Sequence, residues 1–239
     1  MRRKLFGWSI AIALTAHFVL PGTAAAQVGH DPLRSPYHTL RFSQFISVSS
    51  GLLNGNGGSL GVAPHHGPFL GLRYDFLSSG TLTVGLQANL ANLERTIVDP
   101  TKPIATAISG PVKQRTLLGE AIIQFNLTGG KTWHRLAPYV SAGLGLLLTN
   151  DTPLDQSDFK FHTRLALTPG IGTRIFLSDR MFLRLEARSA FWSVTYPPSF
   201  RTTPSSAPTE PPVLATPRKE WLANGWYVVG LGYAFSRPF

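Results

Sequence analysis

Nine charged side chains in the sequence are spaced so that they could form ion pairs with one another. Each lies in a segment where apolar residues alternate with polar or small ones, and each falls on the polar side of that alternation. Alternate residues of a β-strand point to the same face, so these charges would share one face of a sheet. The six basic and three acidic residues are Arg41, Arg73, Asp75, Glu120, Arg164, Arg174, Arg184, Glu186 and Arg188.

Two kinds of chemistry suit this set of charges. The favoured interpretation is a network of ion pairs that fills a narrow interior, because a charge buried without a partner is strongly destabilising. The alternative is a narrow channel for small, anionic solutes, since the arginines outnumber the carboxylates.

A lipid-modifying hydrolase is a second alternative, and it needs a nucleophile, a base and an orienting acid within reach of one another. His162 lies on the polar side beside Arg164, and His38 lies near the end of a segment, so no lipid-facing pair of Ser and His is evident. The chain contains no cysteine, which excludes a lipoprotein anchor, disulfides and thiolate ligands. We therefore predict no catalytic residues, no metal and no cofactor.

The elements that must position these charges are β-strands of about ten residues, the length that crosses a membrane in a barrel. Leu82, Val84, Leu86 and the residues that continue their alternation share one face of the clearest segment. Eight segments fit this pattern: residues 40–48, 70–76, 82–91, 115–127, 136–146, 161–175, 181–191 and 227–235. The sequence therefore predicts an all-β, eight-stranded, antiparallel up-and-down transmembrane β-barrel.

The connections between these segments alternate in length, as in outer-membrane barrels with short periplasmic turns and long extracellular loops. The short connections are residues 77–80, 128–135 and 178–180, and the long ones are residues 50–67, 94–114, 149–160 and 193–225. The last of these is rich in Pro, Ser and Thr, so we expect it to have no fixed fold.

The turn around Asp179 predicts a strand register. Centring a hairpin on this residue places Arg174 opposite Arg184, and the residue opposite Glu186 then also faces inward. Glu186 would bridge these two arginines. Pro169 lies inside one strand and predicts a bulge there, because proline lacks the N–H that a paired strand needs.

A soluble, lipocalin-like barrel is the structural alternative, but its apolar residues would point inward and its polar residues outward. Many glycines and small polar residues occupy the face that carries the charges, whereas the opposite face is aliphatic and aromatic. An arginine facing lipid at the midplane costs about 2–4 kcal/mol, so the charges must face the lumen of a membrane barrel. Aromatic residues near the strand ends suit interfacial girdles: Phe42, Tyr74, Phe76, Phe125, Tyr227 and Tyr233.

The N-terminal residues have the order of a secretory signal peptide. Arg2, Arg3 and Lys4 precede an apolar run that ends at Leu20, and a small-residue stretch ends at Ala26. We expect residues 1–26 to be a cleaved signal peptide, residues 27–37 a short periplasmic segment, and residues 38–239 the barrel.

Several motifs also resemble a known family. The stretches PYVSAGLGL from Pro138, GIGTRIFLSDR from Gly170 and LRLEAR from Leu183 are similar to the small outer-membrane β-barrels related to outer-membrane proteins A and X. The final strand resembles the signal that the barrel assembly machinery reads, with Tyr233, Phe235 and Phe239 as its residues. The resemblance implies the outer membrane of a Gram-negative-type bacterium, with its lipids and the assembly machinery as partners.

The functional prediction is a non-enzymatic outer-membrane barrel with a filled polar lumen. Its role would lie in envelope integrity or in contacts that the surface loops make with a ligand. We expect no nucleic acid as a partner, because many of the arginines are assigned to the lumen.

Overall fold

The computed structural model describes residues 35–150, 155, 157 and 159–235. The chain divides into two compact units, residues 1–35 and 36–239, and the description below concerns the second. The predicted signal peptide (residues 1–26), residues 27–34 of the predicted periplasmic segment, and Phe239 lie outside the described residues.

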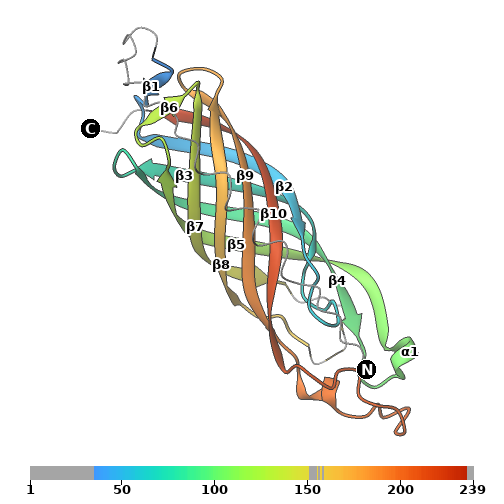
Figure 1. Cartoon of the computed structure of the whole chain (residues 1–239). Helices are drawn as coiled ribbons and strands as arrows, with labels where there is room; N and C mark the ends of the chain where they lie inside the picture. The colour runs from blue at the N-terminus through green and yellow to red at the C-terminus, as the bar shows by residue number, and fades with distance from the viewer. Residues whose placement is uncertain (1–34, 151–154, 156, 158, 236–239) are drawn as a thin grey trace, which may run out of the picture. The chain divides into compact units, whose positions relative to one another are not determined.

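Eight long antiparallel strands close into a barrel, because the last strand pairs with the first on one side and with its predecessor on the other (Figure 1). The prediction of an eight-stranded antiparallel barrel is therefore confirmed. The strands are β2 (Gln44–Asn54), β3 (His66–Leu77), β4 (Leu82–Val98), β5 (Ile108–Asn126), β7 (Leu136–Thr149), β8 (Arg164–Phe176), β9 (Met181–Thr195) and β10 (Lys219–Phe235).

The minor elements lie in the connections. Strand β1 (Tyr37–Thr39) pairs with β6 (Lys131–Trp133), which lies in the connection between β5 and β7. Helix α1 (Ile104–Ala107) precedes β5, and the 3-10 helix η2 (Pro198–Arg201) follows β9. No helix in the described part of the chain is long and apolar enough to cross a membrane. We call the end with the short connections, at 78–81, 127–135 and 177–180, the turn end, and the opposite end the loop end.

The outer face of the barrel is apolar. Leu86, Leu90, Ile123, Leu165 and Ile171 point outward with more than half of their surface exposed. Leaving such side chains in water would forgo about 1.5–3 kcal/mol each. Their exposure on every side of the barrel fits lipid as the surrounding medium, and it excludes the pattern of a soluble barrel.

Aromatic side chains border this outer face. Tyr74, Phe76, Phe125, Tyr227 and Tyr233 all point outward. The hydroxyl of Tyr74 donates to the side-chain oxygen of Gln44 at 3.0 Å, and the guanidinium of Arg180 donates to the hydroxyl of Tyr233 at 2.8 Å. These polar ends suit a membrane–water interface.

Phe42 corrects the predicted aromatic girdle. It precedes β2 and is half-buried, since it packs against an aromatic cluster inside the turn end rather than against lipid. The guanidinium of Arg180 lies 5.3 Å from the centre of its ring.

The register predicted around Asp179 is confirmed, since Arg174 pairs with Arg184 and Gly172 with Glu186. The bulge predicted at Pro169 is wrong. Pairing of β8 with β7 runs unbroken through this residue, and the β8–β9 register is the same on both sides of it. A local gap in the β8–β9 pairing accommodates the missing N–H instead.

The strands near the loop end are longer than predicted. Strands β4 and β5 reach Val98 and start at Ile108, and the β9–β10 pairing continues to Thr195 and Lys219. The prediction that residues 193–225 have no fixed fold is wrong. The ends of this range are paired strands, and residues between them are buried inside the barrel.

Candidate functional site

The candidate site is the lumen of the barrel, which is filled in three layers. Charged side chains from β3, β5, β8 and β9 form the middle layer, and each is at most 5% exposed. We call this set the charged layer: Arg73, Asp75, Glu120, Arg174, Arg184, Glu186 and Arg188.

Inward glycines make room for these long side chains. Gly170 pairs with Arg188, and a Cβ at this glycine would lie 2.3 Å from the Cγ of the arginine. Gly85 pairs with Asp75, and a Cβ there would lie 2.3 Å from its carboxylate oxygen. Gly170 and Gly85 are therefore required by the arginine and the carboxylate opposite them.

Asp75 is the acceptor at the turn side of the charged layer. The Nε of Arg73 donates to it at 2.7 Å, and a terminal nitrogen of Arg174 donates at 3.1 Å. Arg184 lies 3.6 Å from the same carboxylate. Asp75 thus joins β3 to β8 and β9 across the lumen.

Glu186 and Glu120 hold the remaining arginines. Glu186 lies 3.3 Å from Arg73, 3.5 Å from Arg188 and 3.8 Å from Arg184. Glu120 accepts hydrogen bonds from Arg188 at 2.8 Å and from the hydroxyl of Thr168 at 2.6 Å.

Neutral side chains complete the network. The side-chain oxygen of Gln124 accepts from Arg73 at 2.9 Å and from Arg174 at 3.2 Å, and the hydroxyl of Tyr139 donates to Glu186 at 3.1 Å. Gln124 and Tyr139 lie in the predicted strands 115–127 and 136–146, but the sequence prediction did not assign them to the network. The alternation of the sequence could have identified them, because they lie on the same strand face as the charged residues.

Two of the nine predicted lumen charges do not join this network. Arg41 is exposed, because β2 begins only at Gln44 and the alternation does not extend back to it. Arg164 is half-buried at the loop end, where its Nε donates to the backbone oxygen of Phe161 at 2.8 Å. The preceding His162 has a φ of 54°, so the strand alternation is broken there as well.

The predicted bridge from Glu186 to both Arg174 and Arg184 is also corrected. Asp75, on a strand across the lumen, accepts from Arg174, whereas no ion pair joins Glu186 to Arg174 among the described residues. A diagonal neighbour on the next strand was expected to be nearest, but long arginine side chains reach across a narrow barrel.

Apolar side chains fill the lumen at the loop end. Strands contribute Leu53, Phe69, Trp192 and Trp226, and the connections contribute further residues to the same buried cluster. The connection residues are Val62, Ala63, Phe159, Phe161, Phe200 and Leu214. Sequence reasoning missed this layer, although large apolar residues in otherwise polar loops were its signal.

Two polar contacts hold the loops over this apolar layer. Arg95 pairs with Asp155, and its guanidinium lies 5.6 Å from the ring centre of Phe159. Glu220 accepts a hydrogen bond from the backbone N–H of Ser59 at 2.7 Å and another from the hydroxyl of Tyr196. The loops therefore close the mouth of the barrel.

The hydrogen bonds at Glu220 shift its acidity. Partial burial alone would raise the pKa of Glu220, but the hydrogen bonds from Tyr196 and Ser59 outweigh burial and hold this pKa below its usual value. Burial and the hydrogen bond to Glu220 raise the pKa of the Tyr196 hydroxyl, so Tyr196 remains a neutral donor.

An aromatic layer closes the turn end. The rings of Phe45 and Phe182 meet edge to face with centres 5.9 Å apart, and Phe176 packs against Phe182. The guanidinium of Arg174 lies 4.5 Å from the ring centre of Phe45, which joins this layer to the charged layer.

No three His, Asp or Glu side chains gather as metal ligands within the part of the chain that the structure describes. His65 contacts the backbone oxygen of Ala63 at 2.9 Å.

The chain was compared with known proteins, and neither a family model nor a curated protein matches it. The outer membrane protein OprG from Pseudomonas aeruginosa is similar in structure, with a TM-score of 0.52 and 14% identity over 85% of this chain and 100% of that chain. Neisserial surface protein A (NspA) gives a TM-score of 0.52 and 11% identity over 80% of this chain and 97% of that chain. With its apolar outer surface, the chain has the fold of the small, eight-stranded outer-membrane β-barrels.

Proposed function

We propose that this protein is a sealed, non-enzymatic barrel that contributes to the integrity of the outer membrane and presents its loops for contact at the cell surface. The observation that carries the proposal is the filling of the lumen. Two apolar layers enclose the charged layer, and the charges pair with one another across the barrel.

The size of the barrel supports a seal. Eight strands leave an interior just wide enough for side chains. Here those side chains include Trp192, Trp226 and Arg73, none of which is more than 1% exposed. A solute would have to displace both an apolar layer and an ion pair to cross.

The loop end supports the second part of the proposal. Basic side chains are exposed on the loops and on the adjoining strand ends, at Lys102, Arg201, Arg218 and Lys219. Because polar contacts and buried apolar residues fix the loops, a surface ligand would meet a preformed surface. Assembly by the barrel assembly machinery, with Tyr233 and Phe235 on β10 as part of the signal, belongs to the same proposal.

Planar-bilayer recording tests the seal. The purified protein should insert without a steady ionic current, because its lumen is filled. A stable, anion-selective current would instead favour the narrow channel, for which the four arginines and three carboxylates of the charged layer are the supporting observation.

Mass spectrometry of outer-membrane lipids tests the non-enzymatic part. The outer-membrane lipids should have the same acyl-chain composition in cells that express the protein and in cells that lack it. Release of a fatty acid that depends on the protein would favour the hydrolase instead.

Deletion of residues 203–212 tests the surface role, because it keeps the buried Phe200 and Leu214. The variant should assemble normally and lose adhesion. Retained adhesion would remove this loop from the proposed contact surface.

A further inference from the structure

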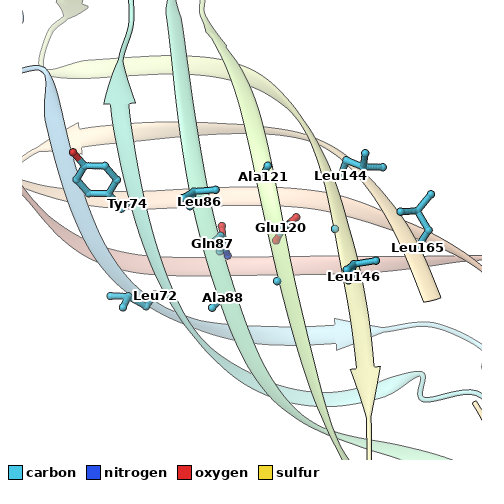
Figure 2. A pocket seen from close by; sticks show the side chains of 12 residues that line it. Leu72, Tyr74, Leu86, Gln87, Ala88, Glu120, Ala121, Leu144, Leu146 and Leu165 are labelled. Atoms are coloured by element: carbon cyan, nitrogen blue, oxygen red, sulfur yellow. The ribbon is translucent and has the colours of Figure 1, made fainter. Parts of the chain in front are cut away.

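The outer face of the barrel carries a hollow where the outward positions of β4 and β5 are Ala88, Gly119 and Ala121. Its volume is about 590 Å³. Figure 2 shows Leu86, Leu144 and Leu165 standing out from the strands, whereas Ala88 and Ala121 leave the ribbons between them nearly bare. The hollow therefore opens toward lipid and not toward the lumen.

One row of paired residues forms the floor and rims of this hollow. Leu72 pairs with Ala88, Ala88 with Gly119, Gly119 with Leu146, and Leu146 with Leu165. The row thus begins with Leu72 and ends with Leu146 and Leu165, and Ala88 and Gly119 lie between these leucines. A Cβ at Gly119 would meet no atom within 4 Å, so the backbone there faces open space.

Two basic side chains lie above the hollow on the same strand face. Gly119, Leu117, Arg115 and Lys113 follow one another at every second position of β5, so all four point outward. Both basic residues are exposed, and neither has an ion pair or a side-chain hydrogen bond with another residue in the described ranges.

The neighbouring strand leaves more uncompensated positive charge at Arg115 than at Lys113. Arg115 pairs with the neutral Asn92, whereas Lys113 pairs with Glu94, whose carboxylate offsets part of its charge. Four residues separate Arg115 from Gly119, which is about 13 Å along the strand. At the usual tilt of barrel strands this becomes about 10 Å along the membrane normal, less than half of a hydrocarbon core about 30 Å thick. A lipid of one leaflet therefore spans both features.

We propose that this face binds an anionic, phosphate-bearing lipid of the outer leaflet, with the phosphate at Arg115 and Lys113 and an acyl chain in the hollow over Gly119. Arginine suits a phosphate through its paired N–H donors. The acyl chain would cover the half-exposed side chains of Leu72 and Leu146.

A second hollow on the outer face lacks this combination. It has a volume of about 770 Å³ and is lined by Val140, Ile171 and Ala187, among other apolar residues. The outward residues above Ala187 on β9 are Ser189 and Phe191, and then Ser and Thr up to the end of the strand. Because no basic side chain follows on that strand face, the second hollow serves as an internal control.

Native mass spectrometry of the purified mature protein in detergent tests the proposal, with phosphatidylglycerol and phosphatidylcholine of identical acyl chains as probes. The wild-type protein should retain one phosphatidylglycerol more tightly than phosphatidylcholine. Arg115→Gln should weaken this preference about five-fold, the effect of one basic residue near an anionic lipid. Gly119→Leu should weaken binding of both lipids by filling the hollow, and the open space at its Cβ lets the barrel fold.

Ala187→Leu is the matched control, since it fills the second hollow and should leave phosphatidylglycerol binding unchanged. The proposal is overturned if Gly119→Leu binds both lipids like the wild type, or if Ala187→Leu weakens binding as much. Equal retention of the two lipids by the wild type, or full competition by inorganic phosphate, would likewise overturn it.

Discussion

Replacing Asp75 by asparagine tests whether the ion pairs of the charged layer stabilise the barrel. The change keeps the shape of the side chain and removes one of three carboxylates that face four arginines. Asp75 accepts hydrogen bonds from Arg73 at 2.7 Å and from Arg174 at 3.1 Å, and both arginines are at most 1% exposed.

The expected loss follows from these two contacts. A hydrogen bond to a charged group contributes about 1.5–3 kcal/mol, so the two contribute about 3–6 kcal/mol. Asparagine replaces one of the two acceptor oxygens by an NH2 donor and removes the charge from the other contact, so most of this contribution is lost. Removing one partner of a buried ion pair costs about 3–5 kcal/mol, in agreement with that range. We expect Asp75→Asn to lower the free energy of unfolding by about 4 kcal/mol.

Urea unfolding in detergent micelles measures this loss, with tryptophan fluorescence and the heat-dependent shift on gels as two readouts. If the free energy of unfolding falls by about 2 kcal/mol per M of urea, the urea concentration at the unfolding midpoint should fall by about 2 M. Asp99→Asn is the control, because its pair with Lys102 at 3.2 Å is largely exposed and should contribute less than about 1 kcal/mol. Equal midpoints for Asp75→Asn and the wild type would refute the reasoning.

Three further predictions concern the loop end and the inward glycines. Asp155→Asn should free the connection between β7 and β8, because it leaves Arg95 without its buried partner; limited proteolysis should cut the variant faster while the strands stay protected. Lowering the pH should loosen the contact between the first and last long connections. The pKa of Glu220 is depressed in the folded state, so its stabilisation is present above its ordinary value of 4.5 and is lost as the pH falls through the folded pKa. The protection of backbone amides against hydrogen exchange, compared at pH 7 and pH 3, measures this change. Gly170→Val should destabilise the barrel by about 1–3 kcal/mol in the same urea assay, because its Cβ would overlap Arg188.

Each of these predictions has its own control. Arg95→Gln should expose the same protease sites as Asp155→Asn, and slower cleavage of either variant would contradict the proposed contact. Glu220→Gln should remove the pH dependence of the protection against exchange in the connections, so a variant that keeps it would point to another titrating group. Gly119→Val, on the outer face, should leave the free energy of unfolding within about 0.5 kcal/mol of the wild-type value.

The faces and the register of the membrane-spanning strands could be predicted from the sequence because lipid imposes a strict rule. An outward arginine at the midplane is too costly, so the position of Arg184 and Arg188 decides which face of β9 points inward. A hairpin centred on Asp179 then gives a register that keeps both faces consistent, and this is the register of β8 and β9. The same reasoning found every residue of the charged layer, but not the neutral side chains of Gln124 and Tyr139 that bind to it.

The loop end could not be predicted in this way, because the medium changes there from lipid to water. Trp192 and Val194 point inward on β9, while Ser193 and Thr195 point outward. This is the pattern of a soluble barrel, so a search for apolar residues on the outer face ends the strand too early. The prediction that Arg41 faces the lumen was wrong for the opposite reason. The alternation was extended back beyond Gln44, where β2 begins.

Strand β9 carries both patterns without any change in its backbone pairing. Its register with β10 is continuous from Met181 to Thr195, so only the choice of residues marks the passage from lipid to water. Losing one residue in the middle of the strand would therefore reverse one half relative to the other, with arginines toward lipid or tryptophan toward water. Length changes in such a strand are tolerable in steps of two residues, whereas the exposed parts of the long connections can change by single residues. Divergence in length among barrels of this design should accordingly be even-numbered within strands and of either parity in the long connections.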